Sequence, residues 1–406
     1  MRRVVVTGMG IWSCLGQSLD EVSASLKAGR SGIIASADRL ESGLRSALMG
    51  DVPVPDLRPL LNRRARSNMS EDTCYAYMAA REAFEVAGIS DAYLKSNEVG
   101  IIFGNDGNVR GVVEANDAFK EGGSSIHVGS SALFKSEASS VTMNLSSIFH
   151  LTGVNFCIGA ACASSSHAIG IGLTLIRQGL QDMILAGGSM ETFAGSAIAT
   201  DALDALSLRN DSPAEASRPF DRDRDGMVPS GGAAALVLED YEHAVARGAV
   251  ILAEVAGYGF SSNGNEDPSR PDSRGEFIAM KRALEDAGVA ADEVDYVNAH
   301  ATSTIVGDIE EDVALSRLFA GKKAYISSTK SMSGHENWMA GASEAVYSIL
   351  MMRDGFVAPN INLENVDESA AELNLVRKTT PARLDCVLSN SSGMGGTNSA
   401  IVLKRI

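Results

Sequence analysis

Short apolar runs alternate with helix-like segments along this chain, and the alternation starts afresh in its second part. Helix-like patterns cover residues 70–87 and 275–287, and each is flanked by apolar runs of strand length. The restart comes with the apolar run at about 251–258. Alternating strands and helices predict buried sheets that are covered by helices. We therefore expect an α/β protein built from two duplicated halves, residues 1–250 and 251–406.

Composition argues against several classes of protein. The 406 residues carry a formal net charge of −16, which is unlike a general nucleic-acid binder. No apolar run approaches the roughly 20 residues that cross a bilayer, so no membrane association is expected. The chain enters an apolar strand directly after Arg3, unlike a signal peptide. Its five cysteines are scattered and lack metal spacing, so we expect a cytoplasmic protein without a metal cofactor.

The strongest chemical signal is a strand-to-helix corner at Cys162. An apolar run beginning near Val154 predicts a short buried strand, and the pattern from Ala163 onward predicts a helix that Gly179 would end. Backbone N–H groups and the positive end of the helix dipole at such a corner favour a thiolate. Most buried cysteines are inert, but this position, together with two histidine motifs, favours a nucleophile.

Three further motifs follow apolar runs in the second half. They are Asn-Ala-His-Ala-Thr-Ser-Thr around His300, Ser-Thr-Lys-Ser-Met-Ser-Gly-His ending at His335, and a glycine-rich turn between two strands over 389–398. In open α/β sheets, ligands bind beyond the carboxyl ends of the strands. Because all four segments follow strands, we expect Cys162, His300 and His335 to meet in one site.

Three weaker signals concern binding. Thr7-Gly8-Met9-Gly10 resembles the start of a dinucleotide fingerprint, but Ser13 stands in place of the third glycine, so no such site is expected. Residues 105–150 are rich in Gly and Ser with one helical stretch, and we interpret them as an excursion toward an interface. A basic run on an acidic chain favours a docking patch for an acidic partner, and this run consists of Arg63, Arg64 and Arg66.

Together the motifs resemble those of the β-ketoacyl-(acyl carrier protein) synthases, the condensing enzymes of fatty acid synthesis in the thiolase superfamily. The likeness runs from Val4 to Asn398 and rests on the runs A-C-A-S-S, H-A-T-S-T, S-T-K-S-M-S-G-H and S-G-M-G-G-T-N. A Cys-His-His set is similar to that of the elongating type I and type II enzymes, whereas the initiating enzymes use Cys-His-Asn. Gly231-Gly232 favours the type I branch.

This resemblance implies a thiolase fold of five layers, αβαβα, and an acyltransferase that works on acyl carrier protein as a homodimer. The substrates are carried on phosphopantetheine, and no other cofactor is implied. Cys162 would hold the growing acyl chain while malonyl-carrier protein loses CO2 and its carbanion attacks the acyl carbonyl. The resemblance also implies that His300 and His335 stabilise the enolate and that Lys330 organises the site electrostatically. Backbone N–H groups of Cys162 and Met394 would form an oxyanion hole, in a turn bent by Gly393 and Gly395. Thr302 and Thr304 would bind the phosphopantetheine.

Some positions depart from the family pattern. Ser392 and Met394 replace two aromatic residues of the glycine turn, and Glu336-Asn337-Trp338 stands where small or Leu-rich residues are usual. These departures favour a specialised synthase, for example one that takes polyunsaturated or aryl-primed chains. Four residues match positions that hold a structural monovalent cation in some relatives, namely Asn298, Glu344, Ser389 and Asn390.

Three alternatives stay open from the sequence. The chain could be the catalytic half of a heterodimer with a chain-length-factor subunit, in an aryl polyene or polyketide pathway. It could be a non-catalytic partner subunit, although such subunits lack the nucleophile that Cys162 supplies. A degradative thiolase would need a second catalytic cysteine near its C-terminus, and Cys386 lies outside the glycine turn. The sequence leaves acyl chain length, unsaturation and pathway undetermined.

Overall fold

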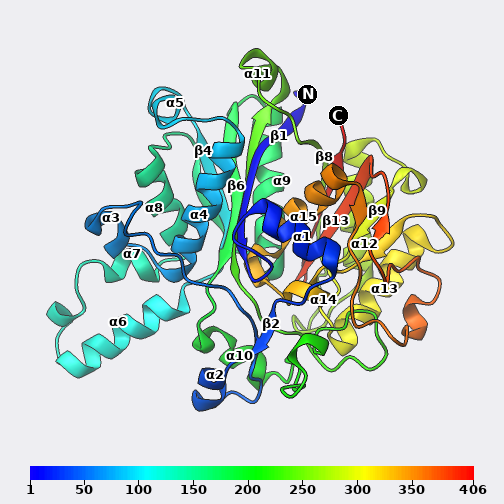
Figure 1. Ribbon diagram of the computed structural model, residues 1–406, viewed down its shortest axis with the longest axis horizontal. Helices are drawn as coiled ribbons and strands as arrows, with labels where there is room; N and C mark the ends of the chain where they lie inside the picture. The colour runs from blue at the N-terminus through cyan, green and yellow to red at the C-terminus, as the bar shows by residue number, and fades with distance from the viewer.

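The computed structural model, which describes residues 1–406, is organised around one large mixed sheet (Figure 1). Its order is β10-β9-β13-β14-β8-β1-β7-β6-β4-β5. Read outward from the centre, each half places its strands in the same sequence: first, fifth, fourth, second and third along the chain. This repeated order is the one that a duplicated fold requires. The strands are β1 (Val4–Ser13), β4 (Gly100–Gly104), β5 (Asn155–Ile158), β6 (Met183–Met190), β7 (Gly232–Asp240), β8 (Ala253–Ser262), β9 (Tyr296–Asn298), β10 (Tyr325–Ser327), β13 (Cys386–Gly393) and β14 (Thr397–Lys404), with two separate pairs, β2 (Ile33–Ala35) with β3 (Leu48–Gly50) and β11 (Phe356–Val357) with β12 (Thr380–Pro381).

Helices cover the outer faces of the sheet and fill the space between its halves. Within the sheet, the two halves meet where β1 pairs with β8, through two residue pairs. Helices α9 (Ser164–Arg177) and α15 (Ala340–Asp354) pack against each other and against strands of both halves. Helix α4 (Glu71–Val86) packs on β1 and β7, and α12 (Ser273–Ala287) packs on β8 and β14. The layers are therefore αβαβα, as the resemblance implies. The other helices are α1 (Leu19–Ala28), α2 (Ala37–Glu41), α3 (Arg63–Ser67), α5 (Asp91–Ser96), α6 (Val109–Gly122), α7 (Ala132–Ser136), α8 (Ser140–Phe149), α10 (Ile198–Ala202), α11 (Tyr241–Ala246), α13 (Ile305–Phe319) and α14 (Lys330–Ser333), with short 3-10 segments that include η2 (Ala161–Ala163), η3 (Ala194–Ala197) and η6 (Asn337–Met339).

Matched glycines set the closest helix-to-strand contact in each half. A Cβ on Gly8 of β1 would lie 2.1 Å from the carbonyl oxygen of Ala83 in α4. A Cβ on Gly257 of β8 would lie 2.3 Å from the carbonyl oxygen of Ala283 in α12. The next glycine along each strand, Gly10 in β1 and Gly259 in β8, is related to the same helix in the same way. The glycines that resemble a dinucleotide fingerprint therefore allow α4 to pack closely on β1. A second pair of glycines does the same for α12 on β8.

Strand β5 is exposed, so the expectation of a buried strand before Cys162 was wrong. The strand pairs with β4 along one side and lies at the end of the sheet order. Its first two residues, Asn155 and Phe156, are exposed, and the Phe156 side chain keeps 50% of its accessible surface. The apolar run was correctly identified as a strand, but its place at the edge depends on strand order, which no local pattern reveals.

The segment 105–150 holds more structure than the single helical stretch expected of it. Three helices, α6, α7 and α8, occupy it. Helix α8 packs on α4 and β4 and belongs to the body of the protein, whereas α6 projects away from it at the lower left of Figure 1. Apolar side chains of α6, among them Val112 and Phe119, are exposed. Such an unpartnered apolar surface is typical of an interface.

Most other expected elements are present with shifted ends. The helix after Cys162 ends at Arg177, and Gly179 adopts the left-handed φ of 73° expected of a stop. The glycine-rich stretch 389–398 is not the long turn that the sequence predicts, because the β13–β14 ladder continues to the pair Gly393–Thr397. Only residues 394–396 connect the two strands. No helix combines the length and the apolarity that a membrane span requires.

Candidate active site

Cys162 lies in η2, between the end of β5 and the start of α9. The preceding residue, Ala161, adopts a positive φ of 46°, which is strained for a residue with a Cβ. Hydrogen bonds hold this corner: the Ala161 N–H donates to Asp106 at 3.2 Å, and the Ser164 hydroxyl donates to the Ala161 carbonyl at 2.6 Å. The strain and its compensating bonds fix the direction of the Cys162 side chain, as expected of a group that must meet a reactant in one geometry.

Both predicted histidines reach Cys162. The Nε2 of His335 lies 3.0 Å from the Cys162 Sγ. The rings of His300 and His335 lie edge to face with centroids 5.2 Å apart, and one donor atom from each of the three residues falls within 4.8 Å of the others. His300 follows β9, and His335 lies between α14 and η6, so segments distant in the chain supply the cluster. One sulfur and two imidazoles thus share a single small volume.

Burial sets the protonation of the cluster. It lowers the pKa of both His300 and His335 well below the usual value, and the charge of Lys330 lowers both further. Burial also raises the pKa of the Cys162 thiol, while backbone hydrogen bonding from Met394 and the Lys330 charge act in the opposite direction. The imidazoles are therefore neutral at neutral pH, and each can donate one N–H or accept one proton.

A buried ion pair lies beside the cluster. Lys330 of α14 donates to Glu344 of α15, and both side chains are 1% exposed. Burial raises the pKa of Glu344 to about 8, with Lys330 opposing the rise. The other oxygen of Glu344 has no partner, nor do the amide oxygens of Asn298 and Asn390. Ser389 is paired with Asn298 across β13 and β9. These unpartnered oxygens are the hard donors that a cation prefers, so the residues suit the predicted cation site.

The β13–β14 turn brings backbone N–H groups to the nucleophile. A Cβ on Gly393 would lie 2.7 Å from the Ala160 carbonyl oxygen, so only glycine lets β13 approach the Cys162 corner. Gly395 and Gly396 turn the chain at positive φ of 90° and 85°. Between them and Gly393, Met394 keeps 51% of its surface exposed. The turn therefore places a Met394 backbone N–H beside the sulfur and leaves the methionine side chain exposed.

One residue of the site has no counterpart among the predicted ones. Glu311 of α13 is buried and accepts the backbone N–H groups of His300, at 2.7 Å, and of Ala301. It also accepts from the side-chain amide of Asn390 at 2.8 Å. Glu311 thereby holds the histidine loop against β13. An acidic run in an otherwise partly apolar helix, over 310–312, was the available signal.

The remaining predicted residues are half-buried or exposed. Thr302 and Thr304 are half-buried with their hydroxyls 3.0 Å apart. Arg63 and Arg64 of α3 are exposed and form no ion pair. Arg66 is half-buried and donates to the Leu61 carbonyl oxygen at 3.1 Å. The first two arginines are therefore free to meet a partner, and the third also braces its own loop.

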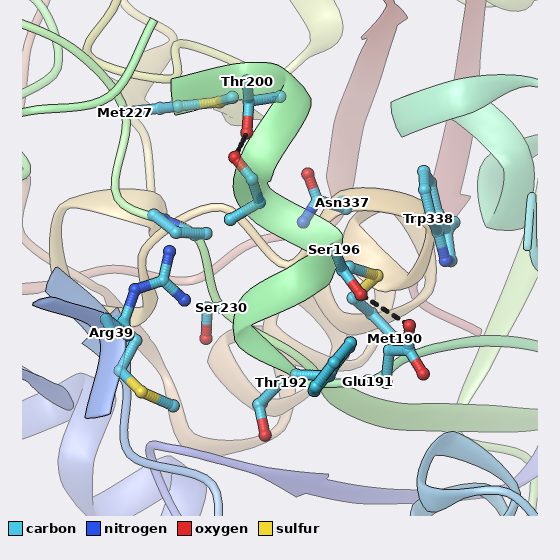
Figure 2. A pocket seen from close by; sticks show the side chains of 14 residues that line it. Arg39, Met190, Glu191, Thr192, Ser196, Thr200, Met227, Ser230, Asn337 and Trp338 are labelled. Atoms are coloured by element: carbon cyan, nitrogen blue, oxygen red, sulfur yellow. Dashed lines mark hydrogen bonds between the residues drawn. The ribbon is translucent and has the colours of Figure 1, made fainter. Parts of the chain in front are cut away.

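The residues after His335 divide between two environments. Glu336 turns inward, where it accepts from the Tyr347 hydroxyl at 2.8 Å and from Ser343. Asn337 and Trp338 instead line a pocket that is partly open to solvent (Figure 2). The other residues of this pocket are Arg39, Met49, Met190, Glu191, Thr192, Phe193, Ser196, Ala197, Thr200, Met227, Pro229 and Ser230. The departure at 336–338 therefore builds a pocket wall as well as a buried carboxylate.

Comparison with known sequences gives full-length matches. A family model described as β-ketoacyl synthase, N-terminal domain, matches residues 1–244, and one described as β-ketoacyl synthase, C-terminal domain, matches residues 252–364. The 3-oxoacyl-[acyl-carrier-protein] synthase 1 of Escherichia coli (strain K12) is 42% identical over 409 residues, covering 100% of both chains. The 3-oxoacyl-[acyl-carrier-protein] synthase 2 of Vibrio cholerae is 36% identical, covering 100% of this chain and 99% of that one.

Solved structures agree with the sequence matches. A β-ketoacyl synthase from Burkholderia phymatum STM815 superposes with a TM-score of 0.95 at 36% identity, covering 100% of both chains. The ishigamide ketosynthase/chain length factor superposes with a TM-score of 0.92 at 30% identity, covering 100% of this chain and 99% of that one. Both the fold and the whole length of the chain are shared with these proteins.

Proposed function

The chain belongs to the β-ketoacyl synthase family, and on that premise we propose that it is an elongating 3-oxoacyl-carrier-protein synthase. It condenses malonyl-carrier protein with an acyl group held on Cys162, releasing CO2. The observation that carries this proposal is the 3.0 Å contact between His335 Nε2 and Cys162 Sγ, beside the second imidazole. The first half, 1–250, supplies the nucleophile, and the second half, 251–406, supplies both histidines.

The first half-reaction transfers the acyl group. The Cys162 sulfur attacks the carbonyl carbon of the acyl thioester, and His335 is placed to receive the thiol proton. The new C–S bond forms as the bond to the carrier thiol breaks, and the carrier leaves as a thiol after taking that proton. Negative charge on the carbonyl oxygen is met by the backbone N–H groups of Cys162 and Met394.

The second half-reaction makes the carbon–carbon bond. Malonyl-carrier protein loses CO2, and the electron pair of the broken bond forms an enolate on the thioester. His300 and His335, neutral because they are buried, donate N–H groups to the enolate oxygen. The enolate carbon then attacks the acyl-Cys162 carbonyl, and the C–S bond breaks to release the 3-oxoacyl-carrier protein. The departing cysteine thiolate takes a proton from solvent, which regenerates the thiol. Lys330 and Glu344 fix the electrostatics around His335, and the Thr302 and Thr304 hydroxyls bind the phosphopantetheine arm. No other cofactor enters this scheme.

A partner is expected at the edge of the sheet. The unpaired side of β5 and the exposed Phe156 are suited to strand pairing with a second chain. We propose that a second copy of this chain pairs there, giving a homodimer. The exposed Arg63 and Arg64 are proposed to dock the acidic carrier protein. The oxygens of Asn298, Glu344, Ser389 and Asn390 are proposed to hold a monovalent cation.

Half-reactions of the purified protein test the proposal. Acyl-carrier protein should acylate the wild type on Cys162, as seen by mass spectrometry of a peptide digest, and should not acylate Cys162→Ala. Malonyl-carrier protein should lose CO2 with both proteins, because the two histidines remain. Wild type supplied with both substrates should form the 3-oxoacyl product. Acylation of Cys162→Ala at the wild-type level, or no condensation by the wild type, would contradict the proposal.

A further inference from the structure

The pocket of Figure 2 contains a buried arginine without a counter-ion. Arg39 of α2 is 3% exposed and lines the pocket. Its Nε makes one long hydrogen bond, 3.4 Å to the Ser46 carbonyl oxygen, and its Nη2 is buried without any partner. Figure 2 shows the guanidinium directed into the space beside the helical segment 194–202. A guanidinium stays charged in proteins, and a buried charge without a partner is costly. Such a group indicates a missing ligand.

Neighbouring acids do not satisfy this arginine. Asp201, whose charge counteracts the effect of burial on the Arg39 pKa, already accepts from the backbone N–H groups of Arg45 and Ser46. Glu191, on the pocket wall, accepts from the Ser196 hydroxyl and from the backbone N–H of Arg110. Both carboxylates are therefore engaged elsewhere, and neither forms an ion pair with Arg39.

The groups left without partners on the pocket wall are donors. Besides the Nη2 of Arg39, the indole Nε1 of Trp338 is buried and has no acceptor. None of the acceptor side chains that line the pocket lacks a partner while buried. A ligand that completes this wall must therefore bring acceptor oxygens. A carboxylate suits the guanidinium best, because the two planar groups can form paired, charge-assisted hydrogen bonds.

The pocket adjoins the catalytic cluster. The Ser230 N–H, from the pocket wall, donates to the His335 carbonyl oxygen at 2.9 Å. Segment η6, which carries Trp338, packs on η2, which carries Cys162. A Cβ on Gly188 would lie 2.7 Å from the Trp338 carbonyl oxygen, so the absence of a side chain there lets β6 meet η6. The nucleophile and the pocket therefore both lie against η6, and apolar side chains such as Met190 offer contact for a hydrocarbon chain.

We propose that this pocket receives the far end of the acyl chain held on Cys162 and that Arg39 selects chains that end in a carboxylate. This inference rests on the proposed function and adds a substrate class, the ω-carboxyacyl thioesters. The methylene chain lies along the apolar wall, and the terminal carboxylate pairs with the Arg39 guanidinium. A chain that ends in a methyl group fills the same space but leaves the buried charge unpaired, and that difference is the source of selectivity.

Acylation rates test the proposal. Thioesters of N-acetylcysteamine, matched in carbon number, are offered in pairs, one n-alkanoyl and one ω-carboxyalkanoyl, and acylation of Cys162 is followed by mass spectrometry. The wild type should prefer the carboxylated chain by at least about tenfold, the effect of one charge-assisted hydrogen bond. Arg39→Leu should reverse the preference, and Arg39→Lys should keep part of it. Arg58→Leu, which removes an exposed arginine that is paired with Asp56 outside the pocket wall, should leave it unchanged.

A preference for n-alkanoyl chains in the wild type, or a preference unchanged in Arg39→Leu, would overturn the proposal. A second measurement does not need acylation. A medium-chain alkanoate should raise the melting temperature of the Cys162→Ala protein more than the alkanol of equal length does. Addition of Arg39→Leu to this variant should remove the difference between the two compounds. The alkanoate effect could be seen while the two kinds of thioester acylate Cys162 at equal rates. In that case the site binds a free carboxylate, and the acyl-chain proposal is wrong. If no thioester acylates Cys162, the proposed function fails, and the alkanoate measurement still decides whether Arg39 binds a carboxylate.

Discussion

The Nε2 of His335 lies 3.0 Å from the Sγ of Cys162, although 173 positions separate the two residues in the chain. Cys162 comes from the η2 corner of the first half, and His335 comes from the segment after α14 of the second half. These corners follow β5 and β10, which are the third strands of the two duplicated halves. The contact between Cys162 and His335 is therefore formed by equivalent corners of a repeated fold, brought together where α9 and α15 pack.

Replacement of either histidine tests the division of labour in this pair. His300→Ala and His335→Ala should each reduce condensation by at least about a hundredfold, because each removes an N–H donor to the enolate. His300→Ala should keep most of the acyl-loading rate, since only His335 contacts the sulfur. Separate assays of acyl loading and malonyl decarboxylation measure the two effects. Normal decarboxylation by the His300→Ala, His335→Ala double variant would refute the enolate role.

Replacement of Glu344 should cost more stability than replacement of Lys330, although the two side chains form one ion pair. Glu344→Gln leaves the Lys330 charge buried, so it should lower the free energy of unfolding by about 3 kcal/mol. Lys330→Met should cost less, because burial raises the pKa of Glu344 and loss of the opposing Lys330 charge raises it further, so the carboxyl takes up a proton. Urea unfolding at neutral pH compares the variants. A larger loss for Lys330→Met than for Glu344→Gln would be inconsistent with this account.

Glu336 should make stability depend on pH. Burial raises its pKa from 4.5 to about 7, against the opposing effect of hydrogen bonds from Ser343 and Tyr347. The folded state thus binds the proton more tightly than the unfolded state, so this carboxyl lowers stability as pH rises from 4.5 through about 7. The free energy of unfolding of Glu336→Gln, relative to that of wild type, should therefore be higher at pH 8 than at pH 5 by about 1–3 kcal/mol. Unfolding midpoints measured at both pH values check this, and a difference independent of pH would count against it.

The exposed edge of β5 should govern assembly. Phe156→Lys puts a charge into the proposed contact between copies, so it should convert dimers to monomers in sedimentation experiments at micromolar concentration. Val250→Lys is the matched control, since Val250 is also exposed but lies outside β5. A wild type that sediments as a monomer would mean that the chain pairs with a different subunit. A Phe156→Lys variant that still sediments as a dimer would mean that the copies meet through another surface.

Carrier recognition should depend on α3. Charge reversal by Arg63→Glu with Arg64→Glu should raise KM for acyl-carrier protein about tenfold or more, while small acyl thioesters are used as before, because complementary charge speeds encounter. Arg58→Glu serves as control, because Arg58 is exposed but already paired with Asp56. Equal effects on both kinds of substrate would show that the substitutions act on the active site and not on docking.

Sequence patterns and a family resemblance together were sufficient to name three residues that the structure brings together. Cys162, His300 and His335 each follow an apolar run, and strand ends are where an α/β sheet collects ligands. The same rule says nothing of Glu311, which clasps the His300 loop from α13, or of Arg39, which enters the pocket from α2. Neither residue follows a strand, so the strand-end rule assigns neither of them to a site.

The sequence by itself determined the strand and helix alternation, the restart that marks two halves, and the chemistry of the Cys-His-His set, because these depend on residue types at short spacing. Only the tertiary structure decided that Gly8 packs a helix, that β5 lies at an exposed edge, and that a buried guanidinium faces a pocket beside the nucleophile. Those facts depend on which distant segments pack together. Burial and partners are properties of that packing, and no local spacing encodes them.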